Sequence, residues 1–169
     1  MKNVHKTLPS CTIDDIHLMA KTIYGEARGE ITKNIHILKK IKDEDILFNH
    51  IQGLIAVGNI IYNRFKKQTW FGKTLSEVCL KPFQFSCWNI NDPNRRKIEN
   101  LKIDSALFQL CLYVAEGIVN RKWEDITKGA DHYHAVWLTP HPKWAKQKCI
   151  TAVIGQHVFY NISEIRGML

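Results

Sequence analysis

The sequence lacks the features that mark several large classes of protein. Its 169 residues contain no run that approaches the roughly 18 consecutive apolar residues needed to span a membrane. It has no glycine loop of the phosphate-binding kind, no internal repeat and no low-complexity linker. Residues 1–10 carry lysines and a proline but no apolar core of signal-peptide length. We therefore expect one domain, residues 1–169, with no membrane span and no signal peptide.

The spacing of the cysteines gives no indication of disulfide or metal-binding pairs. The five cysteines are an odd number, and no two of them form C-x-x-C. This disfavours a disulfide framework or a structural zinc site and favours reduced, mostly buried thiols. Cys87 lies among polar residues and is a candidate nucleophile, but no flanking residue marks it as activated. An unreactive cysteine is the preferred interpretation.

Positive charge, by contrast, is in excess. The net charge is +8 and the pI is about 9.3, which favours anionic partners: nucleic acid, an acidic membrane surface or a bacterial wall. A nucleic-acid-binding protein would gather basic residues and aromatics on one face. Here the lysines are scattered, with a local concentration only in residues 31–50, so we expect no nucleic-acid partner.

Apolar periodicity predicts helices over most of the chain. Residues 13, 16, 20, 23 and 27 are apolar at helical spacing, with Thr12 and Asp15 as a capping box and Gly29 as the stop. Residues 51–65 predict a buried central helix, in which Gly58 indicates the close approach of another backbone. Further helices are predicted after Thr74 and over residues 103–118. We interpret residues 31–50 as a lysine-rich excursion with a short helix and a turn at residues 42–45.

The last third of the chain changes character. Residues 130–135 include aromatic side chains and alternate in character, as successive residues of a strand do. Two further β-prone runs, 150–154 and 157–160, flank Gly155-Gln156, a pair typical of a two-residue hairpin turn. A loop over residues 137–149 joins the first strand to the second, and residues 91–94 read as a turn. The fold class is therefore α+β, a helical body with a small three-stranded antiparallel sheet near the C-terminus.

The first candidate for chemistry is the segment I-Y-G-E-A-R-G-E at residues 23–30. It places Glu26 and Glu30 four residues apart between glycines, at the end of a packed helix. A carboxylate held on a rigid element beside a cleft suits general acid catalysis. A structural ion pair with Arg28 explains the same residues, and the segment alone does not separate the two interpretations.

Amides and aromatic residues form the second candidate group. Gln84, Asn89, Tyr133 and Trp137 are the types that bind sugars, since aromatic planes stack on sugar C–H faces and amides bind ring substituents. For each of Phe83, Phe85 and Trp88 taken alone, packing in the core is the better interpretation.

Histidines on the predicted sheet raise the question of a metal. His132 and His134 alternate on one strand, and His157 lies on another, so together they could bind zinc with an open position. No H-E-x-x-H segment or acidic partner accompanies them, and histidines on aromatic strands commonly form hydrogen bonds instead. We therefore predict no metal and no cofactor.

Five segments in order resemble the cell wall hydrolase family of the spore cortex-lytic enzymes. They are residues 23–30, A-V-G-N-I-I-Y-N-R at 56–64, Q-F-S-C-W at 84–88, G-A-D-H-Y-H at 129–134 with Trp144 downstream, and I-G-Q-H-V-F-Y at 154–160. Together the matches cover nearly the whole chain.

This resemblance implies a lysozyme-like α+β domain that degrades peptidoglycan. The first glutamate of the family's motif is its catalytic acid, which corresponds to Glu26. The enzymes of that family are similar to lytic transglycosylases, which cut between N-acetylmuramic acid and N-acetylglucosamine and close a 1,6-anhydro ring. The partner is then the peptidoglycan glycan strand, bound by a monomer; the candidate substrate-binding residues are Glu30, Gln84, Phe85, Ser86, Tyr133, His134 and Trp137.

Several alternatives stay open at this point. Hydrolysis would need a second carboxylate, for which Glu30 is the nearest in sequence. A zinc amidase acting on the peptide stem and a non-catalytic wall-binding domain are the others. The chain departs from the family in its longer 31–50 segment, which could cover or extend the cleft, and in lacking a signal peptide and a wall-binding domain. We therefore expect an endolysin-like enzyme made in the cytoplasm that reaches the wall after release or by another export route.

Overall fold

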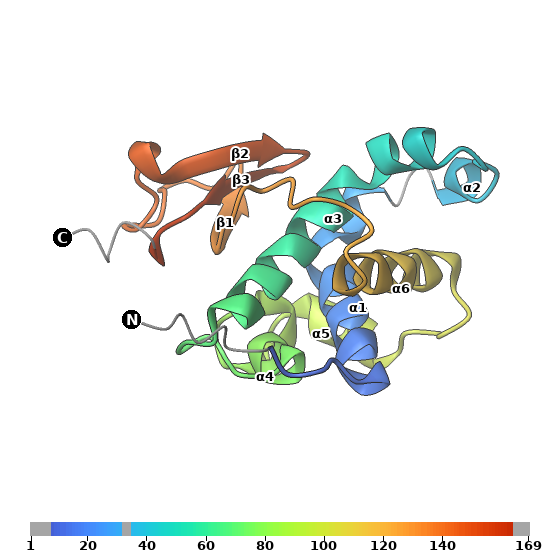
Figure 1. The fold of residues 1–169 in the computed structure, drawn as a ribbon, viewed down its shortest axis with the longest axis horizontal. Coiled ribbons are helices and arrows are strands. Elements are labelled where there is room, and N and C mark those ends of the chain that lie inside the picture. Colours follow the sequence, from blue (N-terminus) through green and yellow to red (C-terminus); the bar gives the residue numbers. More distant parts are fainter. Residues whose placement is uncertain (1–7, 32–34, 164–169) are drawn as a thin grey trace, which may run out of the picture.

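A computed structural model describes residues 8–31 and 35–163, and its ribbon is drawn in Figure 1. Residues 32–34 of the lysine-rich segment, and residues 1–7 of the N-terminus expected to lack a signal peptide, lie outside the described residues. The helices are α1 (Ile13–Ala27), η1 (Arg28–Glu30), α2 (Ile35–Leu38), α3 (Glu44–Lys67), α4 (Leu75–Leu80), η3 (Ser86–Trp88), α5 (Pro93–Glu99), α6 (Ala106–Val119) and η4 (Gln147–Cys149). The strands are β1 (His132–Ala135), β2 (Ile150–Ile154) and β3 (His157–Tyr160). The α+β class is confirmed.

Helix α1 begins where the capping box predicted. The Thr12 hydroxyl accepts a hydrogen bond from Asp15 N at 3.1 Å, and Asp15 Oδ2 accepts one from Thr12 N at 3.0 Å. Asp15 Oδ1 also accepts the Ser76 N–H at 3.0 Å, which ties the start of α1 to the start of α4. The helix ends at Ala27, ahead of the expected stop at Gly29, and the chain continues through Glu30 as the 3₁₀ turn η1.

Helix α3 is longer than residues 51–65. Its N-cap is Asp43, whose Oδ1 accepts hydrogen bonds from Asp45 N and Ile46 N, both at 3.0 Å. The second part of the predicted excursion, residues 44–50, is therefore the first turns of the central helix. Most residues of these first turns are exposed and polar, and they follow several lysines, so no apolar periodicity marks them as helical in the sequence.

The helical core forms where α1, α3 and α6 pack together. A Cβ added at Gly58 would lie 2.4 Å from Ile118 Cδ1 and 3.2 Å from Ile23 Cδ1. The close approach at this glycine is thus made by side chains of α6 and α1 rather than by a second backbone. Burial of large apolar residues such as Ile55 and Phe108 stabilises this body by roughly 1.5–3 kcal/mol for each side chain.

Helix α5 is absent from the sequence-based interpretation, which expected only a turn. Asp92 is its N-cap and accepts the Asn94 N–H at 2.8 Å, and Pro93 occupies the first helical position. An Asp-Pro pair serves a turn and a helix start equally well, so the pair alone does not separate them.

The sheet has the strand order β1-β3-β2, and both pairings are antiparallel, which confirms the three predicted strands. Tyr133 is paired with Phe159 and His134 with Val158. Figure 1 shows the sheet beside the helical body.

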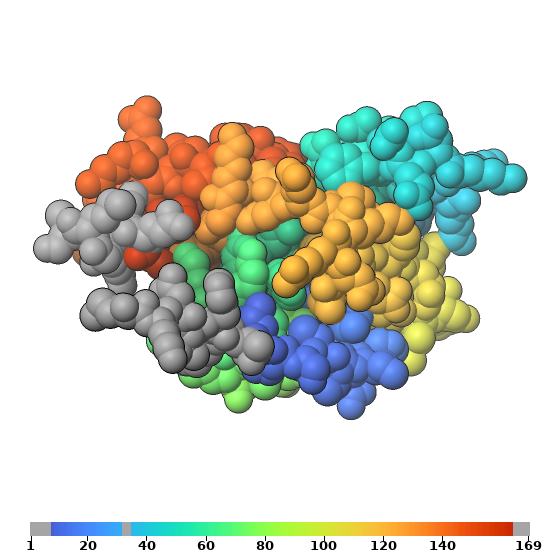
Figure 2. Space-filling view, viewed as in Figure 1, coloured from blue at the N-terminus to red at the C-terminus, as the bar shows by residue number. Residues whose placement is uncertain are grey.

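The chain between α6 and β1 connects the sheet to α3. Figure 2 shows this gold-to-orange stretch lying across the middle of one face of the molecule. Asn63 Nδ2 of α3 donates to Asp125 Oδ2 at 2.7 Å and to Ala130 O at 3.0 Å, and Asn59 Oδ1 accepts the Ile126 N–H at 3.2 Å. These bonds fix the start of β1 relative to α3. Among the described residues, no helix is both long and apolar enough to cross a membrane.

Candidate active site

A cleft of about 670 Å³ opens between the end of α1, the loop after α4, strand β1 and the loop that follows β1. Its volume lies in the range of ordinary ligand-binding pockets. Its lining combines one carboxylate, one guanidinium, amide and hydroxyl groups, and aromatic rings. The lining residues are Glu26, Arg64, Trp70, Pro82, Phe83, Gln84, Ser86, His132, Tyr133, His134, Ala135, Leu138, Pro142 and Trp144.

Glu26 lies in the last turn of α1, and both of its carboxylate oxygens accept hydrogen bonds. Oε1 accepts the Cys87 N–H at 2.9 Å, with the Ser86 hydroxyl 3.5 Å away. Oε2 accepts the Tyr133 hydroxyl at 2.7 Å. Two donors from separate elements therefore hold the carboxylate in one orientation at the cleft surface.

The absence of a side chain at Gly25 allows this arrangement. A Cβ at residue 25 would lie 2.6 Å from Cys87 Cβ, closer than real side chains approach each other. With glycine there, η3 packs directly on α1 and its backbone N–H reaches Glu26. The glycine before Glu26 thus sets the distance between the carboxylate and its donor.

Tyr133 comes to Glu26 from a position 107 residues further along the chain. Its ring stacks on Phe159 at 5.9 Å and meets His157 edge-on at 5.1 Å, so the neighbouring strand fixes it. Burial, reinforced by the Glu26 carboxylate, holds the pKa of Tyr133 well above its usual value. The phenol therefore keeps its proton and acts as a donor to Glu26.

Arg64 supplies positive charge to the cleft from the central helix. It is 6% exposed, and its guanidinium lies over the rings of Phe85 at 4.8 Å and Phe71 at 5.2 Å. Nε donates to Asp131 O at 2.8 Å, and Nη1 donates to Gln84 Oε1 at 3.2 Å. Gln84 is thus oriented by Arg64, and the loop after α4 is tied to α3.

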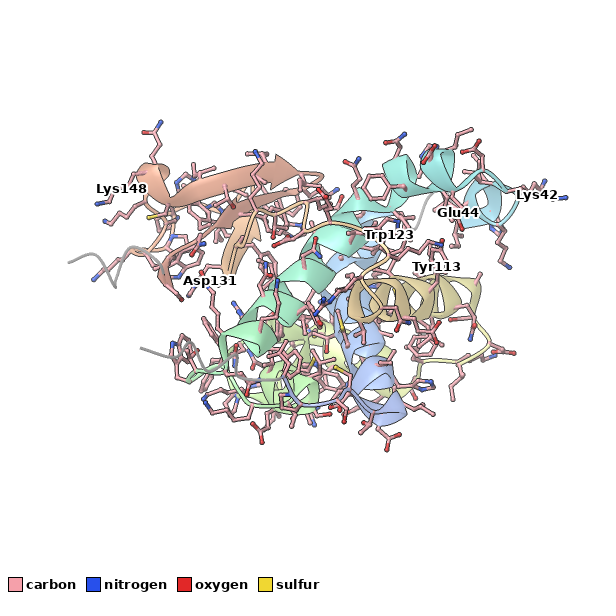
Figure 3. The ribbon with its side chains drawn as sticks, viewed as in Figure 1. Lys42, Glu44, Tyr113, Trp123, Asp131 and Lys148 are labelled. Carbon is pink, nitrogen blue, oxygen red and sulfur yellow. The ribbon has the colours of Figure 1, made fainter. Side chains whose placement is uncertain are left out.

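A buried ion pair beside the cleft fixes the start of β1. Asp131 has no exposed surface, and its carboxylate accepts Lys67 Nζ at 2.6 Å and the Ile162 N–H at 3.0 Å. Figure 3 shows it between the sheet and the end of α3. Burial opposes its ionisation, but hydrogen bonds from His132, Lys67 and the backbone outweigh burial and lower the pKa of Asp131. The Asp131 carboxylate therefore stabilises the fold, and it also orients His132, whose Nδ1 lies 2.7 Å away.

His134 and Trp144 also line the cleft. His134 Nε2 lies 2.8 Å from the Tyr160 hydroxyl, and its Nδ1 lies 2.8 Å from Ala135 O. Trp144 lies against both His132 and His134, with ring centroids 5.1 and 6.0 Å apart. The loop after β1 therefore presents an indole at the cleft, backed by two histidines.

Glu26, Gln84, Ser86, Tyr133 and His134 are the predicted site residues that the structure brings to the cleft. Phe85 is 2% exposed, packs in the core beneath Arg64 and does not line the cleft. Trp137 is 64% exposed, but it does not line the cleft.

Glu30 is also placed elsewhere. Its Oε1 accepts the Gln156 N–H at 2.9 Å and lies 3.2 Å from His157 Nδ1. A Cβ at Gly155 or Gly53 would lie 2.3 or 2.8 Å from its carboxyl group. Glu30 therefore fills a space between α3 and the β2–β3 turn, which explains its position four residues after Glu26 without a role in the cleft.

The three histidines do not converge on a metal site. His132 and His134 contact Trp144, whereas the His157 ring contacts Tyr133 and Phe159 on the other face of the sheet. Within the described ranges, no three His, Cys, Asp or Glu side chains gather in a way that would hold a metal. Cys87 is fully buried, and burial beside Glu26 raises the pKa of its thiol, so it is not an activated nucleophile.

Several lining residues were not predicted from the sequence as parts of the site. Arg64 had a usable signal, since a cation stands among the apolar residues of a buried helix and must find partners there. Trp70, Leu138 and Pro142 had none, because they reach the cleft only through the folding of loops. His132 was considered only as a possible metal ligand, and Trp144 was named only as part of the family resemblance; both line the cleft.

Comparison with known structures shows the same fold. The catalytic domain of the SleB protein of Bacillus cereus matches with a TM-score of 0.61 and 24% identity, over 95% of this chain and 100% of that one. The catalytic domain of the germination-specific lytic transglycosylase SleB from Bacillus anthracis matches with a TM-score of 0.57 at the same identity and coverage. A search of curated proteins gave no match.

Comparison with family models identifies the family. The cell wall hydrolase model matches residues 49–160, well over half of the chain. This region contains most of α3, the Gln84 loop and the whole sheet; Glu26 precedes it and joins the same cleft in the folded protein. On this match, the chain belongs to the cell wall hydrolase family.

Proposed function

We propose that this peptidoglycan-degrading enzyme is a lytic transglycosylase that cleaves the glycan strand between N-acetylmuramic acid and N-acetylglucosamine. One observation carries the proposal: among the described residues that line the cleft, Glu26 is the only carboxylate. A transglycosylase needs one such group, because the substrate itself supplies the nucleophile.

In the first step, Glu26 donates its proton to the glycosidic oxygen as the bond from that oxygen to C1 of the muramic residue breaks. Positive charge develops on the sugar ring, and Glu26 is left as a carboxylate. The Cys87 N–H and the Tyr133 hydroxyl stabilise that carboxylate at 2.9 and 2.7 Å, and Arg64 adds positive charge from the cleft lining.

In the second step, the same carboxylate takes the proton from the C6 hydroxyl of the muramic residue as that oxygen attacks C1. A 1,6-anhydro ring forms, the proton returns to Glu26, and no water is consumed. The enzyme ends the cycle in the protonation state in which it began.

Hydrolysis would require a second carboxylate about 5 to 9.5 Å from the first. Glu30, the nearest in sequence, is engaged by Gln156 and His157 outside the cleft. Asp131 is fully buried and bound to Lys67. Neither is free to act as a nucleophile or to activate water, which supports the transglycosylase over the hydrolase.

The rest of the cleft fits a chain of amino sugars. Trp70 and Trp144 offer aromatic surface for the apolar faces of sugar rings, and Gln84, Ser86 and His134 offer polar groups for their substituents. We propose that a monomer carries out the reaction. Its net charge of +8 would prolong its stay on an anionic wall.

The test is the mass spectrometry of soluble products after digestion of purified peptidoglycan, with Glu26→Gln run in parallel. We expect fragments that end in 1,6-anhydromuramic acid and that disappear with the variant. Reducing ends would instead indicate hydrolysis, and free stem peptides would indicate an amidase. Anhydro products that persist with Glu26→Gln would remove Glu26 from the mechanism.

A further inference from the structure

Phe83 is an aromatic residue in an unusual position at the rim of the cleft. It is 90% exposed, more than any other large hydrophobic residue in the described part of the chain. It lies in the loop between α4 and α5 and lines the cleft together with Pro82. Leaving a phenyl ring in water forgoes the stabilisation that its burial would provide. The ring is therefore a candidate for binding something other than the protein's own core.

The backbone at Phe83 supports this interpretation. The Gln84 N–H donates to Lys81 O at 3.1 Å, closing a turn in which Pro82 is second and Phe83 third. Phe83 has φ +65°, in the left-handed region where such turns prefer glycine or asparagine. A bulky residue in a strained conformation, held there by its neighbours, is often found at functional sites.

The neighbours that hold this turn are the cleft's own residues. Gln84 Oε1 accepts a hydrogen bond from Arg64 Nη1 at 3.2 Å, and Gln84 Nε2 donates one to Phe71 O. These two bonds anchor the turn from its C-terminal side. The strained ring is thus attached to the same element that positions the cleft's polar groups.

A second depression of about 410 Å³ is also lined by Phe83. It is lined by Leu80, Lys81, Pro82, Phe83, Trp88, Asn89, Ile90 and Asn91. Pro82 and Phe83 line both hollows, so the second adjoins the cleft at these two residues. The side-chain amides of Asn89 and Asn91 form no hydrogen bond within the described part of the chain and remain available to a ligand.

We propose that this depression is a further sugar-binding subsite, in which Phe83 stacks on a residue of the glycan strand beyond the cleft. The occupant follows from continuity with the cleft and from chemistry: a ring for the apolar sugar face, and amides for N-acetyl and hydroxyl groups. The inference rests on the proposed function, since it extends the same strand. Its consequence is a preference for long glycan strands over short ones.

The test measures the affinity of the Glu26→Gln protein for a tetrasaccharide and an octasaccharide of alternating N-acetylglucosamine and N-acetylmuramic acid. In this background, Phe83→Asn is expected to weaken octasaccharide binding about fivefold to tenfold, the order expected for one aromatic contact. The loss for the tetrasaccharide is smaller. Phe83→Tyr keeps the ring and retains the affinity.

Stability separates binding from folding in this experiment. Asparagine tolerates left-handed φ, so Phe83→Asn should unfold at the same temperature as its parent or higher, although it binds more weakly. Ile103→Asn is the matched control, because Ile103 is 62% exposed and lines neither hollow. It should leave both affinities unchanged.

The outcomes distinguish the two proposals. Equal losses for both oligosaccharides, or no loss, would overturn the subsite while leaving the proposed function in place. A change in oligomeric state with Phe83→Asn, without a change in octasaccharide affinity, would show that the ring contacts a second copy instead. If the parent binds neither oligosaccharide, or still cleaves them, the proposed function fails and the subsite falls with it.

Discussion

Glu26 and Glu30 are four residues apart in one motif, and their surroundings differ in almost every respect. Glu26 opens on the cleft and accepts hydrogen bonds from Cys87 N and the Tyr133 hydroxyl. Glu30 faces the β2–β3 turn and accepts the Gln156 N–H, with Gly53 and Gly155 against its carboxyl group. The Glu26 carboxylate therefore has open space beside it in the cleft, whereas Gly53 and Gly155 pack against the Glu30 carboxylate.

Under the proposed function, one motif serves both chemistry, through Glu26, and folding, through Glu30. The helix α1 ends at Ala27, between the two glutamates, so the chain turns before Glu30 and points it away from the cleft. Glu26 is held by groups that suit a proton donor and acceptor. Glu30 joins η1 to the sheet that carries Tyr133. The predictions below separate these two roles, beginning with the largest effect.

Glu26→Gln should abolish nearly all activity and leave the fold intact. The amide keeps its shape and still accepts the Cys87 N–H, but it cannot transfer a proton, and general acid–base catalysis is worth about 10²–10⁴-fold. The measurement pairs the clearing of a suspension of purified walls with thermal unfolding. Glu30→Gln is the matched control and should clear the suspension at a rate close to that of the parent. A Glu26→Gln protein with full activity would remove Glu26 as the catalytic acid.

Tyr133→Phe should slow the reaction by about 10- to 100-fold, since it removes a hydrogen bond to a charged group worth roughly 1.5–3 kcal/mol. The ring contacts with Phe159 and His157 are retained, so stability should change little. Steady-state kinetics on a defined glycan oligomer should show the loss in kcat rather than in KM. A rise in KM alone would mean that Tyr133 binds substrate and does not support Glu26.

Glu30→Ala should destabilise the protein by about 1–3 kcal/mol, because it removes the acceptor of the Gln156 N–H, leaves the buried His157 without its carboxylate partner and empties the space between α3 and the turn. The folded fraction should keep its activity within a few-fold. Urea unfolding gives the first quantity, and activity measured well below the unfolding midpoint gives the second. Loss of activity with unchanged stability would place Glu30 in the reaction.

The smallest expected effect is on the pH dependence of stability. Burial raises the pKa of Glu30, but His157 and the Gln156 N–H outweigh it, so the folded pKa lies below its usual value. The unfolded chain then binds more protons as the pH falls, and the stability that Glu30 contributes is lost below about pH 4.3.

Urea unfolding near neutral pH and at about pH 3.5 checks this sign. Glu30→Gln should lose less stability between the two conditions than the parent does. Asp131, whose pKa is also lowered, contributes equally to both proteins and cancels in the comparison. An identical loss in both proteins would mean that Glu30 is not ionised preferentially in the fold.

Much of the fold followed from the sequence, because local patterns determine it. The capping box at Thr12, the apolar stripe of α3 and the Gly155-Gln156 turn each act within a few residues. The start of α3 and the existence of α5 were harder to foresee. Their signals, Asp43 and Asp92, are N-caps that read equally well as turns.

The site was less accessible to sequence reasoning, because distant packing decides which side chains face the cleft. Taken alone, Phe83 and Phe85 were both predicted to pack in the core, and the family resemblance placed Phe85 among the substrate-binding residues. Phe85 is 2% exposed, which agrees with packing, whereas Phe83 is 90% exposed. The turn at Lys81 and the guanidinium of Arg64 determine this difference, and neither is visible in the local pattern. Glu30 was likewise predicted to bind substrate, because nothing in the motif records the space left by Gly53 and Gly155.

The central claim is that one carboxylate carries the reaction without an attacking water. Digestion of peptidoglycan in water enriched in heavy oxygen, followed by mass spectrometry of the new glycan ends, tests it most directly. We predict that the new muramic ends carry no heavy oxygen, because the C6 hydroxyl supplies the oxygen that closes onto C1. Incorporation of heavy oxygen at C1 would contradict the claim and would require a second group in the cleft that activates water.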